Sequence, residues 1–171
     1  LHVLDSTVPA QILQISRKLD PNRTLYIVAS KSGSTTEPNA FCDYFFARAS
    51  EVLQDGAGDH FVAITDPGSS LEGRAEAAGF QSVIHGIAEV GGRFSALSNF
   101  GLFPAATMGL DLGAYMARAR QMEKACRLPD AENPGVLLGI ILGELAMIGR
   151  DKLTIVTSPG VNDFGSWLEQ L

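Results

Sequence analysis

The sequence has 171 residues, a length that suits one compact domain able to bury about 70% of its unfolded surface. Its 46% apolar and 19% charged residues are ordinary for a globular protein, and its 18 glycines and 8 prolines are too few and too scattered for a collagen-like chain or a disordered linker. The formal net charge of −6 argues against a nucleic-acid-binding protein, which normally carries a basic face, but it does not exclude a protein that binds a small anion.

Cysteine and histidine give no sign of a metal site. Cys42 and Cys126 have no second cysteine at metal-ligand spacing, and the three histidines form no H-E-x-x-H set. We therefore expect two reduced core thiols, no metal, no cofactor and a cytoplasmic protein. No uncharged run is apolar and long enough to span about 30 Å of hydrocarbon, so no membrane partner is expected.

Short apolar runs alternate with longer segments of helical periodicity along the chain. In chain order, the patterns predict a strand over 1–4, a helix opened by Pro9, a strand over 24–29, a helix over 36–53, a strand over 61–65, a helix over 70–78, a strand over 80–84, helices over 95–110, 112–127 and 134–149, a strand over 153–157, and a helix-like run over 164–171.

Strands that are apolar on both faces and alternate with helices are typical of a parallel sheet covered on both sides. We therefore predict an α/β fold, a three-layer α/β/α sandwich with a mostly parallel five-stranded sheet, forming one domain over residues 1–171. The chain starts at Leu1 without methionine and stops inside the helix-like run, so we expect a piece of a longer polypeptide.

Small polar residues follow four of the predicted strands, at 5–7, 30–32, 65–67 and 157–159. In an open parallel sheet these carboxyl ends share one edge, and ligands bind in the crevice outside it. The alternative interpretation is that the hydroxyls are helix caps, a common use of serine and threonine.

The densest of these clusters is the hydroxyl loop, residues 30–38 with the sequence SKSGSTTEP, between a predicted strand and a predicted helix. Gly33 permits a tight turn, and the main-chain N–H groups at a helix start have no intrahelical partner. Such a loop suits a phosphate monoester. It has neither the P-loop nor the dinucleotide glycine pattern, which favours a sugar phosphate over a nucleotide. Lys31 either adds a positive charge to this site or points to solvent.

A second candidate is the Gly-Gly-Arg segment, residues 90–95 with the sequence VGGRFS. Paired glycines let the main chain approach a ligand closely. Arg93 stands at a predicted helix start, where a cation faces the wrong end of the helix dipole. It is either paired with an acid such as Glu89 or reserved for an anion.

Together the two segments resemble the glucose-6-phosphate isomerase family, whose signatures look like S-K-[ST]-x-[ST]-T-x-E and V-G-G-R-[FY]-S. Residues 30–37 and 90–95 match them, in order and about 60 residues apart. Residues 91–111 and 133–160 look most like the isomerase part of bifunctional transaldolase/glucose-6-phosphate isomerases. The resemblance covers nearly the whole chain and implies the sugar isomerase (SIS) domain, a flavodoxin-like fold.

The resemblance also implies roles for individual residues. Ser30, Ser32 and Thr35 would hold the sugar 6-phosphate with Lys31 nearby, while Ser34 and Thr36 are adjacent. Gly92 and Arg93 would lie beside C1 and C2 of the sugar, where Arg93 stabilises the enediolate of aldose–ketose isomerisation. The implied substrates are glucose 6-phosphate and fructose 6-phosphate, in glycolysis and gluconeogenesis.

The chain also departs from the family pattern. A whole isomerase of this family has two SIS domains, and this chain resembles the first. The family's general base, a glutamate, matches no residue here, and Glu169 stands too early to be assigned. His2, His60 and His85 match no family position and are expected at surface or packing positions. We therefore expect this chain alone to be inactive and to partner a second SIS domain.

Two other functions remain open. One is a non-catalytic sugar-phosphate sensor, which needs no Gly-Gly-Arg segment and would be joined to a DNA-binding helix-turn-helix. The other is an interaction module with a vestigial site, whose apolar helices over 95–110 and 134–149 would form a homodimer surface.

Overall fold

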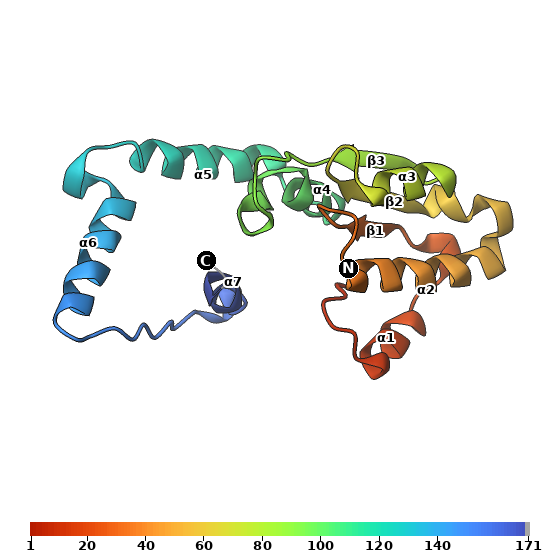
Figure 1. Ribbon diagram of the computed structural model, residues 1–171, viewed down its shortest axis with the longest axis horizontal. Coiled ribbons are helices and arrows are strands. Elements are labelled where there is room, and N and C mark those ends of the chain that lie inside the picture. Colours follow the sequence, from red (N-terminus) through yellow and green to blue (C-terminus); the bar gives the residue numbers. More distant parts are fainter. Residues whose placement is uncertain (170–171) are drawn as a thin grey trace. The chain divides into compact units, whose positions relative to one another are not determined.

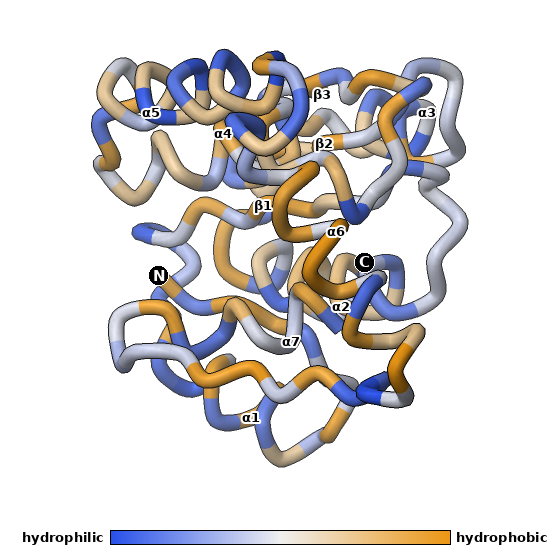
Figure 2. The backbone as a smooth tube through the Cα atoms, turned by 90° about the vertical axis from the view of Figure 1, so that its left-hand side faces the viewer, coloured by the Kyte–Doolittle hydropathy of each residue, from blue (hydrophilic) through white to orange (hydrophobic). Residues whose placement is uncertain are grey.

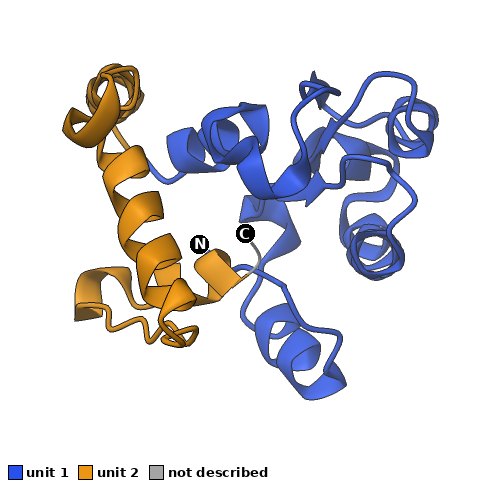
Figure 3. Ribbon diagram, turned by 60° about the vertical axis from the view of Figure 1, so that its left-hand side comes forward, with its two compact units in different colours: residues 1–109 blue, residues 110–171 orange. Residues whose placement is uncertain are grey.

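The computed structural model of the chain describes residues 1–169 and groups them into two compact units, 1–109 and 110 onward (Figure 3). The first unit contains both candidate segments and all the strands of the described residues (Figure 1). Its elements are α1 (Pro9–Ser16), η1 (Pro21–Arg23), β1 (Tyr26–Ala29), α2 (Thr36–Leu53), η2 (Gln54–His60), β2 (Phe61–Thr65), α3 (Ser70–Ala77), β3 (Ser82–His85), η3 (Gly92–Leu97) and α4 (Asn99–Thr107).

A parallel sheet in the order β1-β2-β3 forms the centre of the first unit. Ile27 of β1 pairs with Val62 of β2, and Val62 in turn pairs with Ser82 of β3. All five residues of β2 are buried, as expected for a central strand that is apolar on both faces.

Helices pack against this sheet, and Figure 2 colours the backbone, including β1 and β2, by hydropathy. Phe61 and Ala63 of β2 pack in one core cluster with Phe45 of α2 and Leu71 of α3. Because successive side chains of a strand point to opposite faces, Val62 and Ile64 face the other side of the sheet. Helix α4 packs against β2 there, and both residues are buried.

Helix α2 and strand β2 have the predicted boundaries, and β1 and β3 form within two residues of the predicted ranges. The five-stranded sheet is not observed, because the sheet of the described residues has three strands. Residues 1–4 instead lie along an open hollow of about 900 Å³ beside β1, with Leu1 and Val3 mostly exposed, and residues 153–157 are irregular. An apolar run indicates burial, but a strand also needs a main-chain partner that the run itself cannot specify.

The predicted helix over 95–110 is split in two at Ser98, which ends η3 and begins α4. The Ser98 hydroxyl donates to the Ser95 carbonyl (2.7 Å) and accepts from the Phe100 N–H (3.3 Å), so one side chain ends the first element and caps the second. Pro104 lies inside α4.

The second unit is helical within its described residues, with Asn133 as the N-cap of its most apolar helix. Its elements are α5 (Leu112–Ala125), η4 (Asp130–Glu132), α6 (Pro134–Met147), η5 (Pro159–Val161) and α7 (Phe164–Glu169). Helix α7 confirms the helix-like run as far as Glu169; Gln170 and Leu171 lie outside the described residues. The single domain over 1–171 stays a prediction.

No helix within residues 1–169 combines the length and the apolar character that a membrane crossing requires.

Candidate functional site

The segments that follow the three strands meet at one edge of the sheet. Of the four polar clusters predicted to share such an edge, those at 30–32 and 65–67 follow strands of this sheet, whereas those at 5–7 and 157–159 follow no strand. Lys31 follows β1, Asp66 follows β2 and Ile87 follows β3. Lys31 Nζ lies 2.8 Å from Asp66 Oδ2 and donates to the Ile87 carbonyl at 2.9 Å. The carboxyl edge of the sheet therefore brings together residues that are 35 and 56 positions apart in the chain.

The hydroxyl loop leaves β1 at Ser30, whose main-chain N–H and carbonyl are both hydrogen-bonded to β2. Its N–H donates to the Ile64 carbonyl (3.0 Å), and its carbonyl accepts from Thr65 Oγ1 (2.7 Å). Its buried hydroxyl donates to Thr35 Oγ1 across the loop (3.4 Å). The first phosphate-binding candidate is thus fixed to the central strand.

The middle of the loop turns at Gly33, which has a φ of +69°. A Cβ there would lie 2.5 Å from the Leu71 N atom, so only glycine fits without a shift of the chain. On either side, the exposed Ser32 and Ser34 hydroxyls are 2.9 Å apart, and the Ser34 N–H donates to Ser32 Oγ. Asn39 of α2 donates to the Gly33 carbonyl (2.9 Å) and closes the turn.

The hydroxyl of Thr35, the N-cap residue of α2, accepts no capping hydrogen bond from the described residues. In contrast, Ser69 caps α3 by accepting from the Glu72 N–H, and Ser98 caps α4. The main-chain N–H groups of Ser32, Gly33 and Thr35 also have no acceptor within residues 1–169. Helix capping therefore does not explain why this loop is rich in hydroxyls. The unpaired N–H donors of the loop lie at the N-terminus of α2, where the helix dipole favours an anion.

The side chain of Lys31 points to the neighbouring loops and not to open solvent. Both Asp66 carboxylate oxygens lie 2.8 Å from its Nζ, and the ring centroid of Phe100 is 5.5 Å away. Only 22% of the Lys31 side chain and 20% of the Asp66 side chain are exposed. In this arrangement the positive charge of Lys31 is neutralised by Asp66.

The Gly-Gly-Arg segment lies against the same lysine. A Cβ on Gly92, which opens η3, would lie 4.0 Å from Lys31 Cδ. Arg93 is exposed, with its guanidinium carbon 5.9 Å from the ring centroid of Phe94. The structure thus places the two candidate segments side by side within one unit, although they are about 60 residues apart.

Three residues with structural roles at this site were not among the predicted site residues: Thr65, Asp66 and Gly86. Thr65 and Asp66 belong to a predicted polar strand end, which was the available signal. Gly86 had no such signal. A Cβ on Gly86 would lie 2.6 Å from Asp66 Oδ1 and 2.4 Å from Phe100 Cε2, so its importance depends on the packing of distant residues.

A second polar pair lies beside this edge. Glu72 of α3 accepts from the Gly68 N–H and lies 2.6 Å from His85 Nε2. The Gly68 N–H, and then the His85 ring, lower the pKa of Glu72 below its ordinary value of 4.5. His60 Nδ1, for its part, lies 3.1 Å from the Thr24 carbonyl. No group of three or more His, Cys, Asp or Glu side chains in the described residues is arranged to hold a metal ion.

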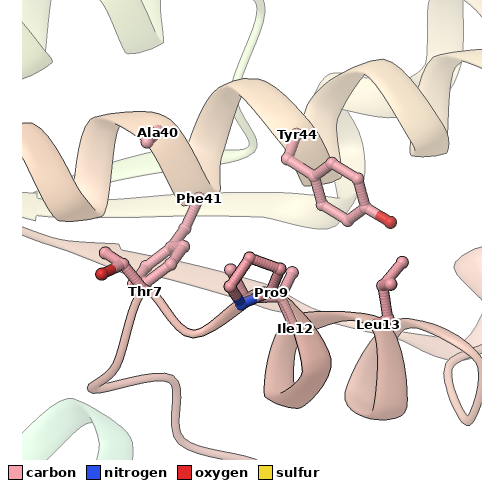
Figure 4. A pocket seen from close by; sticks show the side chains of 7 residues that line it. All are labelled: Thr7, Pro9, Ile12, Leu13, Ala40, Phe41 and Tyr44. Atoms are coloured by element: carbon pink, nitrogen blue, oxygen red, sulfur yellow. The ribbon is translucent and has the colours of Figure 1, made fainter.

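A cavity of about 360 Å³ lies between α1 and α2, away from these polar groups (Figure 4). Its lining residues carry no charge, and none belongs to the hydroxyl loop or to the Gly-Gly-Arg segment: Thr7, Pro9, Ile12, Leu13, Ala40, Phe41 and Tyr44. Because phosphate recognition needs charge or several convergent donors, we place the candidate site at the sheet edge and not in this cavity.

Fold and site define a class: a parallel α/β domain with a hydroxyl-rich loop and a helix N-terminus at the carboxyl edge of its sheet. Comparison with known proteins adds homologues named glucose-6-phosphate isomerase. The chain is 38% identical over its whole length to that of Synechococcus sp. strain JA-3-3Ab, and 38% identical over 99% of its length to that of Thermus thermophilus. It spans 33% and 41% of these relatives, respectively, and no family model matches it.

Solved structures agree with this similarity. A glucose-6-phosphate isomerase from Chlamydia trachomatis matches 96% of the chain with a TM-score of 0.79 and 27% identity. A hypothetical protein from Thermus thermophilus matches 84% with a TM-score of 0.77 and 38% identity. The chain covers 32% of the Chlamydia structure and 34% of the Thermus structure. The chain is therefore homologous to a segment of proteins named glucose-6-phosphate isomerase, and this segment makes up about a third to two fifths of their length.

Proposed function

We propose that this chain is the phosphosugar-binding SIS domain of a glucose-6-phosphate isomerase that interconverts glucose 6-phosphate and fructose 6-phosphate. The observation that carries the proposal is the uncapped N-terminus of α2. The hydroxyl loop leads into this N-terminus with unpaired N–H groups and exposed hydroxyls, and Gly92 lies near Lys31 of the same loop. The names of the homologues supply the reaction.

In this proposal the sugar 6-phosphate accepts hydrogen bonds from the Ser30, Ser32 and Thr35 hydroxyls and from the loop N–H groups. Each bond to a charged group contributes about 1.5–3 kcal/mol, so four or five outweigh the screened repulsion from a chain of net charge −6. Lys31 contributes through its main chain or its positive field while its side chain holds Asp66.

The sugar then extends from the hydroxyl loop toward the Gly-Gly-Arg segment. Gly92 leaves room for the C1–C2 end of the open-chain sugar, and Arg93 stabilises the negative charge of the enediolate. Proton transfer between C1 and C2 needs a general base, which we assign to no residue of this chain. A second SIS domain supplies that base, and no cofactor takes part. The closer likeness to bifunctional transaldolase/isomerases remains a prediction.

The test is calorimetric titration of the chain with 6-phosphogluconate, an open-chain sugar phosphate. We expect Ser32→Ala to weaken binding by about 1–3 kcal/mol, because it removes one hydrogen bond to a charged group. The matched control is Ser82→Ala. Ser82 is the exposed first residue of β3, at the end away from the candidate site, so this variant should bind like the wild type. Equal affinity of the Ser32 and Ser82 variants, or no binding by the wild type at millimolar ligand, would contradict the proposal.

A further inference from the structure

The ion pair between Lys31 and Asp66 joins separate loops of the candidate site. Lys31 belongs to the hydroxyl loop after β1, and Asp66 to the turn after β2. The same ammonium also donates to the Ile87 carbonyl after β3 and lies over the Phe100 ring of α4. One side chain thus links the loops that follow all three strands of the described sheet.

The pair is shielded, which distinguishes it from the other ion pairs of the described residues. About a fifth of each partner's side chain is exposed, whereas Asp43 in the Arg74–Asp43 pair between α2 and α3 is 70% exposed. Shielded pairs are screened less by salt, and removing one partner leaves the other charge without compensation. Asp66 therefore constrains where Lys31 can lie more strongly than a surface carboxylate would.

The surrounding chain is shaped to admit the Asp66 carboxylate. Gly86 has no side chain where a Cβ would lie 2.6 Å from Asp66 Oδ1 and 2.4 Å from Phe100 Cε2. The Asp66 N–H also donates to the Lys31 carbonyl (3.1 Å), so main chain and side chain join the same two residues. Both bonds act on the residue next to Ser32, and a Cβ on Gly92 would lie 4.0 Å from Lys31 Cδ, so the Gly-Gly-Arg segment is a near neighbour of this side chain.

We propose that Asp66 is a positioning residue which, through Lys31, sets the distance between the hydroxyl loop and the Gly-Gly-Arg segment. The inference rests on the proposed function and deepens it. A ligand that reaches both segments depends on this distance, whereas a ligand held by the hydroxyl loop alone does not. Asp66 touches neither ligand in this proposal; it acts by holding Lys31 between the two segments.

The test compares two probes on the full 171-residue chain: 6-phosphogluconate, long enough to reach both segments, and inorganic phosphate, which reaches only the hydroxyl loop. We expect Asp66→Asn to weaken binding of 6-phosphogluconate by about tenfold or more, the equivalent of one charge-assisted hydrogen bond. Its affinity for inorganic phosphate should not fall, because the uncompensated Lys31 charge favours an anion at the hydroxyl loop, and retained binding also shows that the variant is folded. A general loss of stability would weaken the binding of both probes alike, so a change in the ratio of the two affinities reports on the position of Lys31.

Two further variants separate position from charge. Gly86→Ala crowds the Asp66 carboxylate without changing the net charge and should reproduce the selective loss. Asp43→Asn removes the same charge from the exposed α2–α3 pair and should leave both affinities unchanged. If Asp66→Asn weakens both probes equally, or neither, the positioning role is refuted while the phosphate site stands. If the wild type binds neither probe, the proposed function fails and the positioning role fails with it.

Discussion

Thr65 shows at the scale of one residue how a buried hydroxyl holds a surface loop in place. Its Oγ1 has one proton, which goes to the Ser30 carbonyl (2.7 Å), an acceptor only. Ser69 Oγ, 2.6 Å away, must therefore donate to Thr65, and it accepts in turn from the Glu72 N–H (3.1 Å). The start of the hydroxyl loop is thus tied through two side chains to the first turn of α3.

Replacing this hydroxyl by a methyl group should destabilise the fold at that point. We expect Thr65→Val to lower the free energy of unfolding by about 1–3 kcal/mol, because the Ser30 carbonyl loses its partner in a buried place. Urea titration followed by circular dichroism measures the change. The matched control is Thr24→Val, whose hydroxyl donates to the Asp20 carbonyl in an exposed setting, so its loss should be smaller. Equal losses would argue against the role given to Thr65.

Gly33 and Gly86 illustrate two different reasons for glycine at one site. The φ of +69° at Gly33 belongs to a region that local sequence can indicate, since a glycine among hydroxyl residues predicts a turn. Gly86 has no positive φ, and its lack of a side chain matters because Asp66 and Phe100 approach it. Only the first of these reasons could be read from the neighbouring residues.

At the scale of elements, the way each helix begins separates structural from functional polar residues. Asn133 accepts from the N–H groups of Gly135 and Val136 at the start of α6, and its amide donates to the Cys126 carbonyl. Those bonds satisfy the helix end by itself. Helix α2 has no such side-chain cap, so its N-terminus is the one of these two that can receive an outside anion.

The cap of α6 provides a prediction at this scale. We expect Asn133→Ala to lower the free energy of unfolding by about 0.5–2 kcal/mol, because two N–H groups lose their acceptor. Asn133→Asp, which keeps the acceptor oxygens and loses only the amide donor, should retain most of the stability. Urea titration of both variants makes the comparison. An alanine variant as stable as the aspartate variant would show that the cap contributes nothing measurable.

Two predicted strands, residues 1–4 and 153–157, do not form in the structure. Residues 1–4 and 153–157 have the apolar composition of strands, yet neither pairs with the sheet of the described residues. Secondary structure in helices depends on neighbours three and four residues away, whereas a strand depends on a partner that lies elsewhere in the chain. Helices α2, α5 and α6 were accordingly predicted within two residues, while the number of strands was overestimated.

At the scale of the whole molecule, every residue of the candidate site lies in the first unit, residues 1–109. The chain spans about a third to two fifths of the curated relatives it matches, and the general base is assigned to none of its residues. Binding and catalysis are therefore expected to be separable in this chain. In the proposed function, every phosphate-binding residue lies within this chain, whereas the general base for proton transfer does not.

This separation predicts that the 171-residue chain binds a sugar phosphate without converting glucose 6-phosphate to fructose 6-phosphate. A coupled spectrophotometric assay measures the turnover, with the full-length Thermus thermophilus relative as the positive control. Turnover by the chain alone near the typical enzymatic value of about 10 s⁻¹ would contradict the prediction and would require a general base within these residues.

The sequence alone was sufficient to predict the central strand β2, the boundaries of α2, the hydroxyl loop between a strand and a helix, and the two segments that resemble an isomerase. These features depend on hydropathy, periodicity and turn chemistry over a few neighbouring residues. Only the tertiary structure decided that the sheet of the described residues has three strands, that Lys31 pairs with Asp66, and that Gly92 comes close to Lys31. Each of these is a contact between residues distant in the chain, and such contacts form when the whole fold brings their main chains and charges within a few ångströms of each other.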